Sequence, residues 1–275
     1  MEKRNRAEGW KHAKLSGHEN EKLIEKSIKG DLKFQNRLLK RVGKENSKII
    51  EISFGGLKEK NVESVFTNNT TKSKTDVYIK LDDGTKLNIS IKKSLSGQVY
   101  LISDKRFIDG FELQFNKKIP NDVKRAIRLF WGSASDTLSI ANDINGKYFS
   151  YEKRKNRLVA ETLKTYDQKL YIELIKWFNE NILEIIDFCF SRGLTKNQSD
   201  WANVIWYINS LGENSVDELF PIKDFYNAKM TSAEYGSRGG GTTIQLPFGF
   251  VQWHQGQMQF HHRYDKINSF LNGTL

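Results

Sequence analysis

Apolar residues recur every three to four positions at the start of this chain, which is the period of an amphipathic α-helix. The pattern covers residues 16–30 and residues 31–42. Ser16 and Glu19 fit a capping box, and Gly30 follows the first pattern as a C-terminal stop. These residues predict two consecutive helices, the first of which begins at Ser16.

After these helices the pattern changes to an alternation of apolar and polar residues. Residues 48–54 alternate, and so do residues 75–81 and 86–93 on either side of a DDGT turn. Such alternation is typical of strands, and an Asp-Gly turn between two runs indicates a β-hairpin. The sequence therefore predicts a strand, a hairpin and a further short strand over residues 97–103.

Helical periodicity returns in the middle of the chain. The helices that it predicts lie over residues 121–132, 135–143, 158–190 and 200–211. Ser199 stands where the last of these helices would be capped.

The last part of the chain alternates again. Residues 242–254 and 258–267 predict two strands that pair around a QGQ turn. Strands near both ends of the chain, with helices between them, predict a single domain of the α/β or α+β class over residues 1–275.

The chain carries a large surplus of positive charge. It has 44 Lys and Arg residues against 33 Asp and Glu residues, a net charge of +11 and a pI near 9.4. Such a surplus favours polyanionic partners, and no basic amphipathic helix with an aromatic face indicates a membrane. The longest mainly apolar run, residues 182–190, is too short to cross a bilayer. Nucleic acid is therefore the expected partner.

Two further observations concern the cellular compartment. The first residues lack the apolar segment of a secretory signal, and the single cysteine, Cys189, excludes an internal disulfide. We therefore expect an intracellular protein in a reducing cytoplasm.

The predicted hairpin brings together residues that could carry out chemistry. Residues two apart on a strand share a face, so Ser90 and Lys92 project together. Pairing around the DDGT turn is expected to place residues whose numbers add up to about 167–168 opposite each other, which puts Asp76 near residues 91–92. Alternation favours Lys92 over Lys93 as the lysine that meets this aspartate.

A neighbouring carboxylate and lysine are what phosphodiester hydrolysis needs. The carboxylate can hold Mg²⁺, which neutralises charge on the phosphate and orients a water, and the lysine can stabilise hydroxide or developing charge. The alternative is a plain surface hairpin whose cross-strand Asp–Lys pair contributes about a few tenths of a kcal/mol.

This arrangement resembles the PD-(D/E)xK nuclease superfamily, which includes most type II restriction endonucleases. Asp76 matches the aspartate of the motif, and residues 90–92 (SIK) match the acidic-x-Lys element of the next strand. Thr75 stands in place of the usual proline, and Ser90 stands in place of the usual acidic residue.

The resemblance implies an αβββ core, with a central mixed sheet flanked by helices. The catalytic core would cover residues 16–115, and residues 116–275 would supply helices and C-terminal strands for DNA recognition and dimerisation. The implied activity is Mg²⁺-dependent hydrolysis of phosphodiester bonds in double-stranded DNA. The enzyme would act as a homodimer in a prokaryotic-like cytoplasm.

The resemblance also implies a role for each residue of the hairpin. Asp76 would be the primary metal ligand, Lys92 would activate the water, and Ser90 would be a secondary catalytic contact. Because Ser90 replaces an acid, a glutamate from elsewhere is expected to complete the metal shell. Glu21 in the first helix and Glu51 in the first strand are the candidates.

Several residues outside this motif are candidates for DNA contact. The glycines of loop 237–243 (SRGGGTT) would let the backbone approach phosphates or a groove, although a flexible loop can need glycine for its dihedral angles alone. His261 and His262 are adjacent on a strand and point to opposite faces, so they fit no metal motif. The candidate DNA-binding residues are His18, Lys93, Arg238, Gly239, Gly240, Thr242 and His261.

Two other functions stay open on the sequence alone. A structure-directed nuclease, such as a junction resolvase, would share the same core. A DNA-binding protein without catalysis would use the hairpin only as scaffold.

Overall fold

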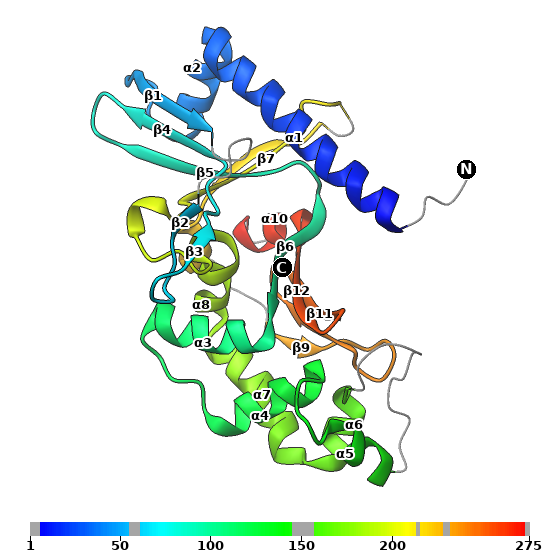
Figure 1. The fold of residues 1–275 in the computed structure, drawn as a ribbon. Coiled ribbons are helices and arrows are strands. Elements are labelled where there is room, and N and C mark those ends of the chain that lie inside the picture. The colour runs from blue at the N-terminus through cyan, green and yellow to red at the C-terminus, as the bar shows by residue number, and fades with distance from the viewer. Residues whose placement is uncertain (1–5, 55–60, 145–156, 213–214, 228–231, 273–275) are drawn as a thin grey trace. The chain divides into compact units, whose positions relative to one another are not determined.

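The computed structural model describes residues 6–54, 61–144, 157–212, 215–227 and 232–272, with side chains from Gly17 onward (Figure 1). The chain forms two compact units, and each is built on a five-stranded β-sheet. The first unit comprises Met1–Ser64, Asn68–Leu95 and Phe190–Asp224. The second unit comprises Val65–Thr67, Ser96–Cys189 and Phe225–Leu275.

The sheet of the first unit is mixed, with the strand order β1-β4-β5-β7-β8 (Figure 1). β5 and β7 run parallel, whereas the other neighbouring pairs are antiparallel. The strands are β1 (Ile49–Phe54), β4 (Val77–Leu81), β5 (Lys86–Lys92), β7 (Val204–Ile208) and β8 (Asp217–Pro221). The predicted hairpin is present as β4 and β5, and the mixed sheet with its flanking helices confirms the expected α/β class.

Two helices, α1 (Arg6–Gly30) and α2 (Leu32–Arg41), precede this sheet in the chain. Asp31 caps α2, because its carboxylate accepts hydrogen bonds from the backbone N–H groups of Lys33 at 2.8 Å and Phe34 at 3.2 Å. Both helices were expected from the spacing of their apolar residues.

The prediction that the first helix begins at Ser16 is wrong. α1 already begins at Arg6, so Ser16 lies within the helix and cannot cap it. The preceding residues, RAEGWKHAKL, contain no proline and several strong helix formers, so the helix extends further toward the N-terminus.

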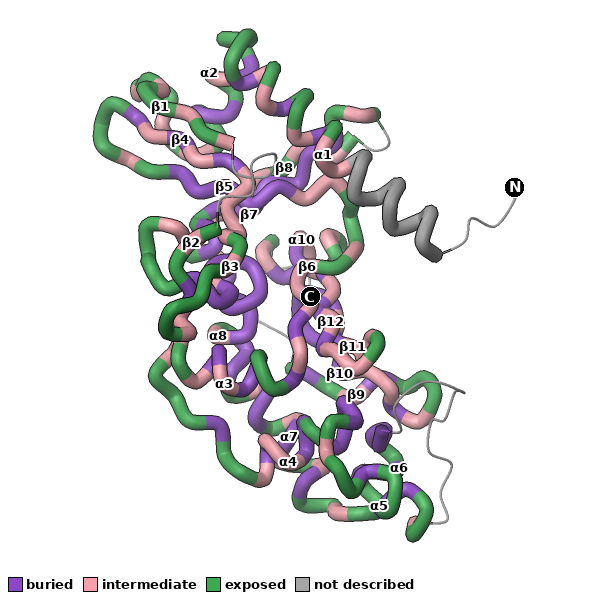
Figure 2. The backbone as a smooth tube through the Cα atoms, in the orientation of Figure 1, coloured by how far each residue is buried: buried purple, intermediate pink, exposed green. Residues whose placement is uncertain are grey.

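The prediction of a helix over residues 200–211 is also wrong. Residues 204–208 (VIWYI) form β7, which lies between β5 and β8 and is buried along its whole length (Figure 2). A fully buried strand shows no alternation, so periodicity cannot distinguish it from a buried helix. Ser199, expected to cap this helix, lies within a short 3-10 helix over Gln198–Asp200.

One face of the mixed sheet packs on α1 and α2 and forms the apolar core of the first unit. Because side chains alternate along a strand, the odd-numbered residues of β4 and β5 point into this core and the even-numbered ones point away. The core residues are Ile24, Ile28, Phe34, Leu38, Leu39, Val77, Ile79, Leu81, Leu87, Ile89, Ile91, Val204, Trp206 and Ile208.

The sheet of the second unit is antiparallel, with the strand order β6-β12-β11-β10-β9. Its strands are β6 (Ser96–Ser103), β9 (Glu234–Tyr235), β10 (Thr243–Leu246), β11 (Gly249–His254) and β12 (Gln257–Arg263). The C-terminal strand pair is confirmed, with Gln255 and Gly256 at positive φ in the turn. The strand predicted over residues 97–103 is present as β6, which pairs with β12.

The helices of the second unit are α3 (Asp104–Phe115), α4 (Asn121–Trp131), α5 (Thr137–Asp143), α6 (Ala160–Tyr166), α7 (Gln168–Glu180), α8 (Ile182–Asp187) and α10 (Tyr264–Leu271). The helices expected over residues 121–132 and 135–143 are α4 and α5. The pattern over residues 158–190 is divided among α6, α7, α8 and a π-helical turn at Phe188–Arg192. Extended backbone at Asp167, which caps α7, ends α6.

The remaining elements are short. They are the strand pair β2 (Asn61–Glu63) and β3 (Thr70–Lys72), and the helix α9 (Asp224–Asn227). Within the described ranges, every helix is too short or too polar to span a bilayer.

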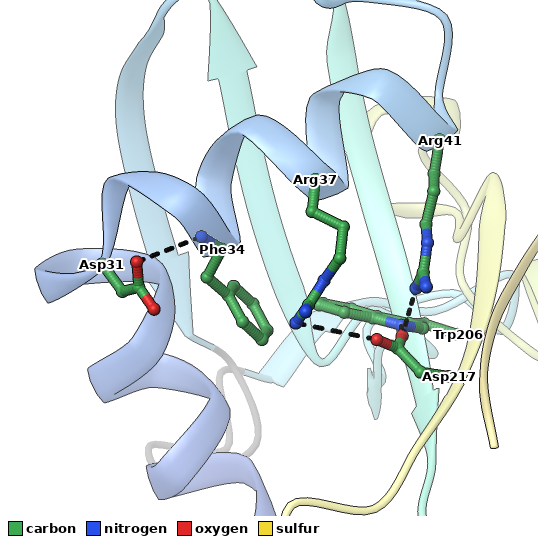
Figure 3. A network of polar contacts seen from close by, with 6 residues as sticks. All are labelled: Asp31, Phe34, Arg37, Arg41, Trp206 and Asp217. Atoms are coloured by element: carbon green, nitrogen blue, oxygen red, sulfur yellow. Dashed lines mark hydrogen bonds and ion pairs between the residues drawn. The ribbon is translucent and has the colours of Figure 1, made fainter. Parts of the chain in front are cut away.

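A polar network attaches α2 to β7 and β8 (Figure 3). Arg37 and Arg41, one turn apart on α2, both pair with the carboxylate of Asp217, and Arg37 Nη2 lies 3.7 Å from Asp217 Oδ2. The indole N–H of Trp206 donates to Asp217 Oδ1 at 2.8 Å. The Trp206 ring also packs on Phe34, with the ring centroids 5.7 Å apart. Asp217 therefore links the helix to two strands and satisfies a buried indole.

Asp217→Ala is expected to lower the free energy of unfolding by about 1–3 kcal/mol, because it leaves a buried indole donor without an acceptor. Glu218→Ala is the matched control, since Glu218 is the next residue of β8 and is exposed. Its effect is expected to stay within about 0.5 kcal/mol. Urea unfolding of both variants measures the difference, and equal losses would contradict the role given to the network.

Candidate active site

The β4–β5 hairpin places Asp76 opposite Ser90. Val77 pairs with Ile89 and Lys80 pairs with Lys86, so Asp76, directly before β4, faces Ser90. The predicted position near residues 91–92 is therefore wrong by one or two residues.

The turn explains this difference in register. It was expected to span all four residues of DDGT, but the backbone N–H of Leu81 donates to the carbonyl of Thr85 at 2.9 Å. A three-residue loop remains, and its last residue, Gly84, has a φ of +83°. A three-residue hairpin loop ending in a left-handed glycine is a common type. Because it is one residue shorter than the expected turn, each residue of β4 pairs with a residue of β5 at least one position earlier than predicted.

Asp76, Ser90 and Lys92 are linked by short contacts on the polar face of the hairpin. The Asp76 carboxylate accepts hydrogen bonds from the backbone N–H of Ile91 at 2.7 Å and from the Ser90 hydroxyl at 3.4 Å. The Lys92 ammonium donates to the Ser90 hydroxyl at 2.6 Å and to the Ile91 carbonyl at 3.3 Å. The serine that replaces the usual acid therefore bridges the carboxylate and the ammonium.

Burial perturbs both charges of this pair. It raises the pKa of Asp76, and the nearby Lys92 ammonium and the hydrogen bonds from Ile91 and Ser90 lower that pKa in part. Burial lowers the pKa of Lys92, and the carboxylates of Asp76 and Glu21 act in the opposite direction. Strongly perturbed groups that face one another are found most often at functional sites.

Glu21 is the glutamate that lies beside this pair. Burial, together with the charge on Asp76, raises the pKa of Glu21 to about 7, and Lys92 lowers it in part. Glu21 Oε2 is buried without a hydrogen-bond partner. His18 is one turn earlier on α1, with its Nδ1 3.7 Å from Glu21 Oε2.

Asn20 holds this part of α1 against the end of β7. Its side-chain amide donates to the carbonyl of Ile208 at 3.0 Å and accepts from the backbone N–H of Ser210 at 2.7 Å. Asn20 is fully buried, so these hydrogen bonds fix the position of α1 relative to β7. They thereby also fix the backbone of Glu21, the next residue of α1.

Glu51, the other candidate glutamate, occupies a different place. It is exposed on β1, opposite Lys80, which is four residues along β4 from Asp76. Four strand residues correspond to about 13 Å. Glu51 thus shares the face of Asp76 but is not beside it.

A cavity of about 480 Å³ lies on this polar face. Its lining includes the carboxylates of Glu21, Glu51, Asp76 and Asp200, together with His18 and other residues. The fold therefore gathers acidic groups from α1, β1, the start of β4 and the segment before β7 around one space.

The acidic groups fit a cation that keeps most of its own water. Across the described residues, no group of three or more His, Cys, Asp or Glu side chains could enclose a metal ion. Asp76 and Glu21 nevertheless offer two carboxylates. Glu21 has a buried oxygen without a hydrogen-bond partner, and burial together with the charge on Asp76 raises its pKa. Mg²⁺ typically takes one or two carboxylates and completes its shell with waters and phosphate oxygens. The donor set suits that mode of binding.

Most residues that line the cavity were not among the sequence candidates, and Asn88 and Asp200 are two of them. Asn88 shares the strand face of Ser90 and Lys92, which was the signal that could have identified it. Its amide donates to the carbonyls of Ser199 at 2.8 Å and Trp201 at 2.7 Å, while its Oδ1 is buried without a partner. Asp200 could not be identified, because its segment was assigned to a helix.

The conformation and packing of loop 237–243, in the second unit, explain why it contains glycines. Gly239, Gly240 and Gly241 all have positive φ, and the carbonyls of Gly240 and Gly241 accept hydrogen bonds from the first turn of α6. A Cβ at Gly241 would lie 2.4 Å from the Cβ of Ala160. The loop is thus packed on α6, and its exposed residues include Arg238 and Gly239.

The other candidates for DNA contact lie on different elements. Thr242 is half-buried, and its hydroxyl donates to the Arg238 carbonyl at 3.3 Å. Lys93 directly follows β5 and is half-buried. His261 is half-buried on β12, whereas the adjacent His262 is buried, which is consistent with the opposite faces expected for them.

Comparisons with known proteins add little to these observations. The sequence matches no protein-family model and no curated protein sequence. The fold is similar to a solved structure, the restriction endonuclease MspI in complex with its cognate DNA, at 12% sequence identity and a TM-score of 0.44. The match covers 88% of this chain and 83% of that chain. The likeness is weak, so the function has to be inferred from this chain's own residues.

Proposed function

We propose that this protein is a Mg²⁺-dependent endonuclease that hydrolyses phosphodiester bonds in double-stranded DNA, as type II restriction endonucleases do. The observation that carries the proposal is the cluster of Asp76, Ser90, Lys92 and Glu21, in which Asp76 and Glu21 line one cavity, in a chain with a net charge of +11. Carboxylates that can hold a cation, next to a half-buried lysine, are suited to stabilising the negative charge of phosphoryl transfer.

In this proposal Asp76 and Glu21 hold the cation. Burial and, second to it, the charge on Asp76 raise the pKa of Glu21, and a divalent cation would offset both effects by stabilising the ionised carboxylates. When bound, Mg²⁺ neutralises charge on the phosphate and lowers the pKa of a bound water. Glu51 faces the same cavity from a greater distance and is assigned no direct ligand role.

Lys92 acts on the attacked phosphate and on the water. Its half-buried ammonium stabilises the negative charge that develops in the transition state, because partial exclusion of water strengthens this interaction. Ser90 holds the ammonium and the Asp76 carboxylate in one arrangement through its hydroxyl. Since burial lowers the pKa of Lys92, this side chain also gives up a proton more easily than an exposed lysine does.

The proposal also assigns residues that contact the DNA. His18 at the cavity and Lys93 after β5 would contact phosphates, and Arg238 with its loop would contribute from the second unit. A homodimer belongs to the proposal, because cutting both strands of a symmetric site needs two active sites related by a twofold axis.

Cleavage of plasmid DNA in the presence of Mg²⁺ tests the proposal. Asp76→Ala and Lys92→Ala are each expected to lower the cleavage rate at least about a hundredfold, because each removes a group that stabilises the transition state. Asp83→Asn is the matched control, since that aspartate belongs to the same hairpin but pairs with Lys44 at the turn. Discrete cleavage that survives both alanine substitutions would refute the proposal.

The same assay separates the two alternatives. Cutting of a four-way junction but not of a linear duplex with the same arms would favour a structure-directed nuclease. Tight, salt-sensitive DNA binding without metal-dependent turnover would favour a protein that binds DNA and has no catalytic activity.

Cation binding without DNA gives a test that does not depend on activity. Ca²⁺ affinity, measured by titration calorimetry, is expected to rise about tenfold per pH unit from about pH 5.5 and to level off above about pH 7. The sign follows from the raised pKa of Glu21, which is about 7: below that pH a proton competes with the cation, and binding must release it.

Glu21→Gln is expected to weaken Ca²⁺ binding at pH 8 and to remove most of this pH dependence. Glu25→Gln is the matched control, since Glu25 is one turn further along α1 and pairs with Lys29. An unchanged pH dependence in Glu21→Gln would contradict the assignment of this glutamate to the cation.

A further inference from the structure

The antiparallel sheet of the second unit has a polar face that the proposed chemistry does not use. The opposite face is apolar, with Met258 and Phe260 buried and the ring of Phe260 5.6 Å from that of Phe107 in α3. The strand register places mostly polar side chains in rows across the other face. One row is Thr243, Gln252, Gln259 and Leu101, and the next is Gln245, Phe250, His261 and Gln98.

Four of these residues form a connected ladder, which we call the glutamine face: Gln98, Gln252, Gln259 and His261. The Gln252 amide donates to Gln259 Oε1 at 2.9 Å, and the Gln259 amide donates to Gln98 Oε1 at 2.8 Å. Gln252 Nε2 also lies 3.2 Å from His261 Nε2. The ladder thus runs across the three strands β11, β12 and β6.

The ladder determines which polar groups remain for a ligand. Gln252 uses both amide N–H groups on Gln259 and His261 and keeps its carbonyl oxygen as an acceptor. Gln98, at the exposed end, keeps both of its N–H donors, and Gln259 keeps one N–H and one lone pair. Because neighbouring contacts already hold these side chains, a ligand would order them at little entropic cost.

His261 is held in a neutral, accepting form. Its ring stacks on Phe250, with centroids 4.5 Å apart and an angle of 8° between the planes. Burial, together with the nearby His254, lowers the pKa of His261. The imidazole is therefore uncharged at neutral pH, and its Nε2 can accept a hydrogen bond from Gln252.

The segments that hold the ladder carry no formal charge; the nearest charged residues of the sheet are Glu234, opposite Gln245 on β9, and Arg263, at the end of β12. In a chain that is 28% charged, four segments contain no Asp, Glu, Lys or Arg: residues 98–103, 243–245, 250–254 and 257–261. Such a surface lacks the positive charge that dominates binding to the phosphate backbone. It is suited to a neutral ligand that presents hydrogen-bond donors and acceptors in a regular row.

The base edges of duplex DNA are such a ligand. A glutamine amide can donate a hydrogen bond to adenine N7 and accept one from the N6 amino group. A two-stranded β-ribbon is narrow enough to enter the major groove, where these groups are exposed. The exposed Arg238, in the loop that leads into β10, can meet the phosphates beside the groove. This arrangement combines a neutral reading surface with a flanking cation.

We propose that the glutamine face reads base edges of duplex DNA and sets the sequence preference of the protein, with at least one A·T pair at a fixed position. The inference rests on the proposed function in taking DNA as the substrate. The inference adds the residues that determine the preferred DNA sequence. These residues lie on other elements than the proposed catalytic residues.

Selection from duplexes with a randomised central segment, with Ca²⁺ in place of Mg²⁺, tests this inference on the full chain. Bound duplexes are sequenced for the wild type and for Gln252→Ala, Gln259→Ala and Gln98→Ala. Gln168→Ala is the matched control, since that glutamine is exposed on α7 of the same unit. Gln98→Ala removes an exposed side chain at the end of the ladder, so it keeps the test decisive if an inner variant unfolds.

The wild type is expected to enrich a short motif that contains an A·T pair. The glutamine-face variants are expected to lose preference at one position by about tenfold, with non-specific affinity within about twofold of the wild type. Gln168→Ala is expected to enrich the wild-type motif unchanged.

Two results would overturn the inference: an identical motif in wild type and all glutamine-face variants, or no sequence preference in the wild type. Because selection needs no cleavage, its outcome is separate from that of the plasmid assay. A motif that depends on the glutamine face, in a protein that does not cut DNA, would overturn the proposed nuclease activity and support the reading surface.

Discussion

The register of the β4–β5 hairpin is the constraint on which the rest of the candidate site depends. One face of the hairpin packs on α1 and α2, and the other carries Asp76, Ser90 and Lys92. Because side chains alternate with a period of two, a slip of one residue would exchange the faces and put both charges into the core. The left-handed Gly84 closes a three-residue loop, and the apolar core then enforces the register that this loop sets.

This register explains why a serine can stand where an acid is usual in the superfamily that the motif resembles. Asp76 and Lys92 are both affected by burial, and a buried charge is tolerated only with a partner. Ser90 connects the two with a hydroxyl, and the second carboxylate comes from α1 instead of β5. Asp76 and Glu21 thus come from two elements, and in the proposed function the docking of α1 through Asn20 positions the second carboxylate.

Local patterns predicted the parts of the structure that are determined locally. Both N-terminal helices, the hairpin, the face of Lys92 and the C-terminal strand pair followed from spacing, because each is decided by residues close together in sequence. β7 was missed, because a strand buried on both faces shows no alternation. The exact partner of Asp76 was missed by one or two residues, because a turn of the same sequence can close with three or four residues. Glu21 and Glu51 could not be told apart, since nothing in the spacing places α1 against the sheet.

The sequence by itself determined the hairpin, the charges on its polar face and the cationic character that favours DNA, since alternation and composition need no long-range contact. Tertiary structure decided that β7 completes the mixed sheet, that Glu21 lies beside Asp76 and that three distant glutamines form a ladder across β6, β11 and β12. Each of these depends on which segments pair in space. That choice is made by the burial of whole apolar faces, a property of the assembled chain that no local pattern contains.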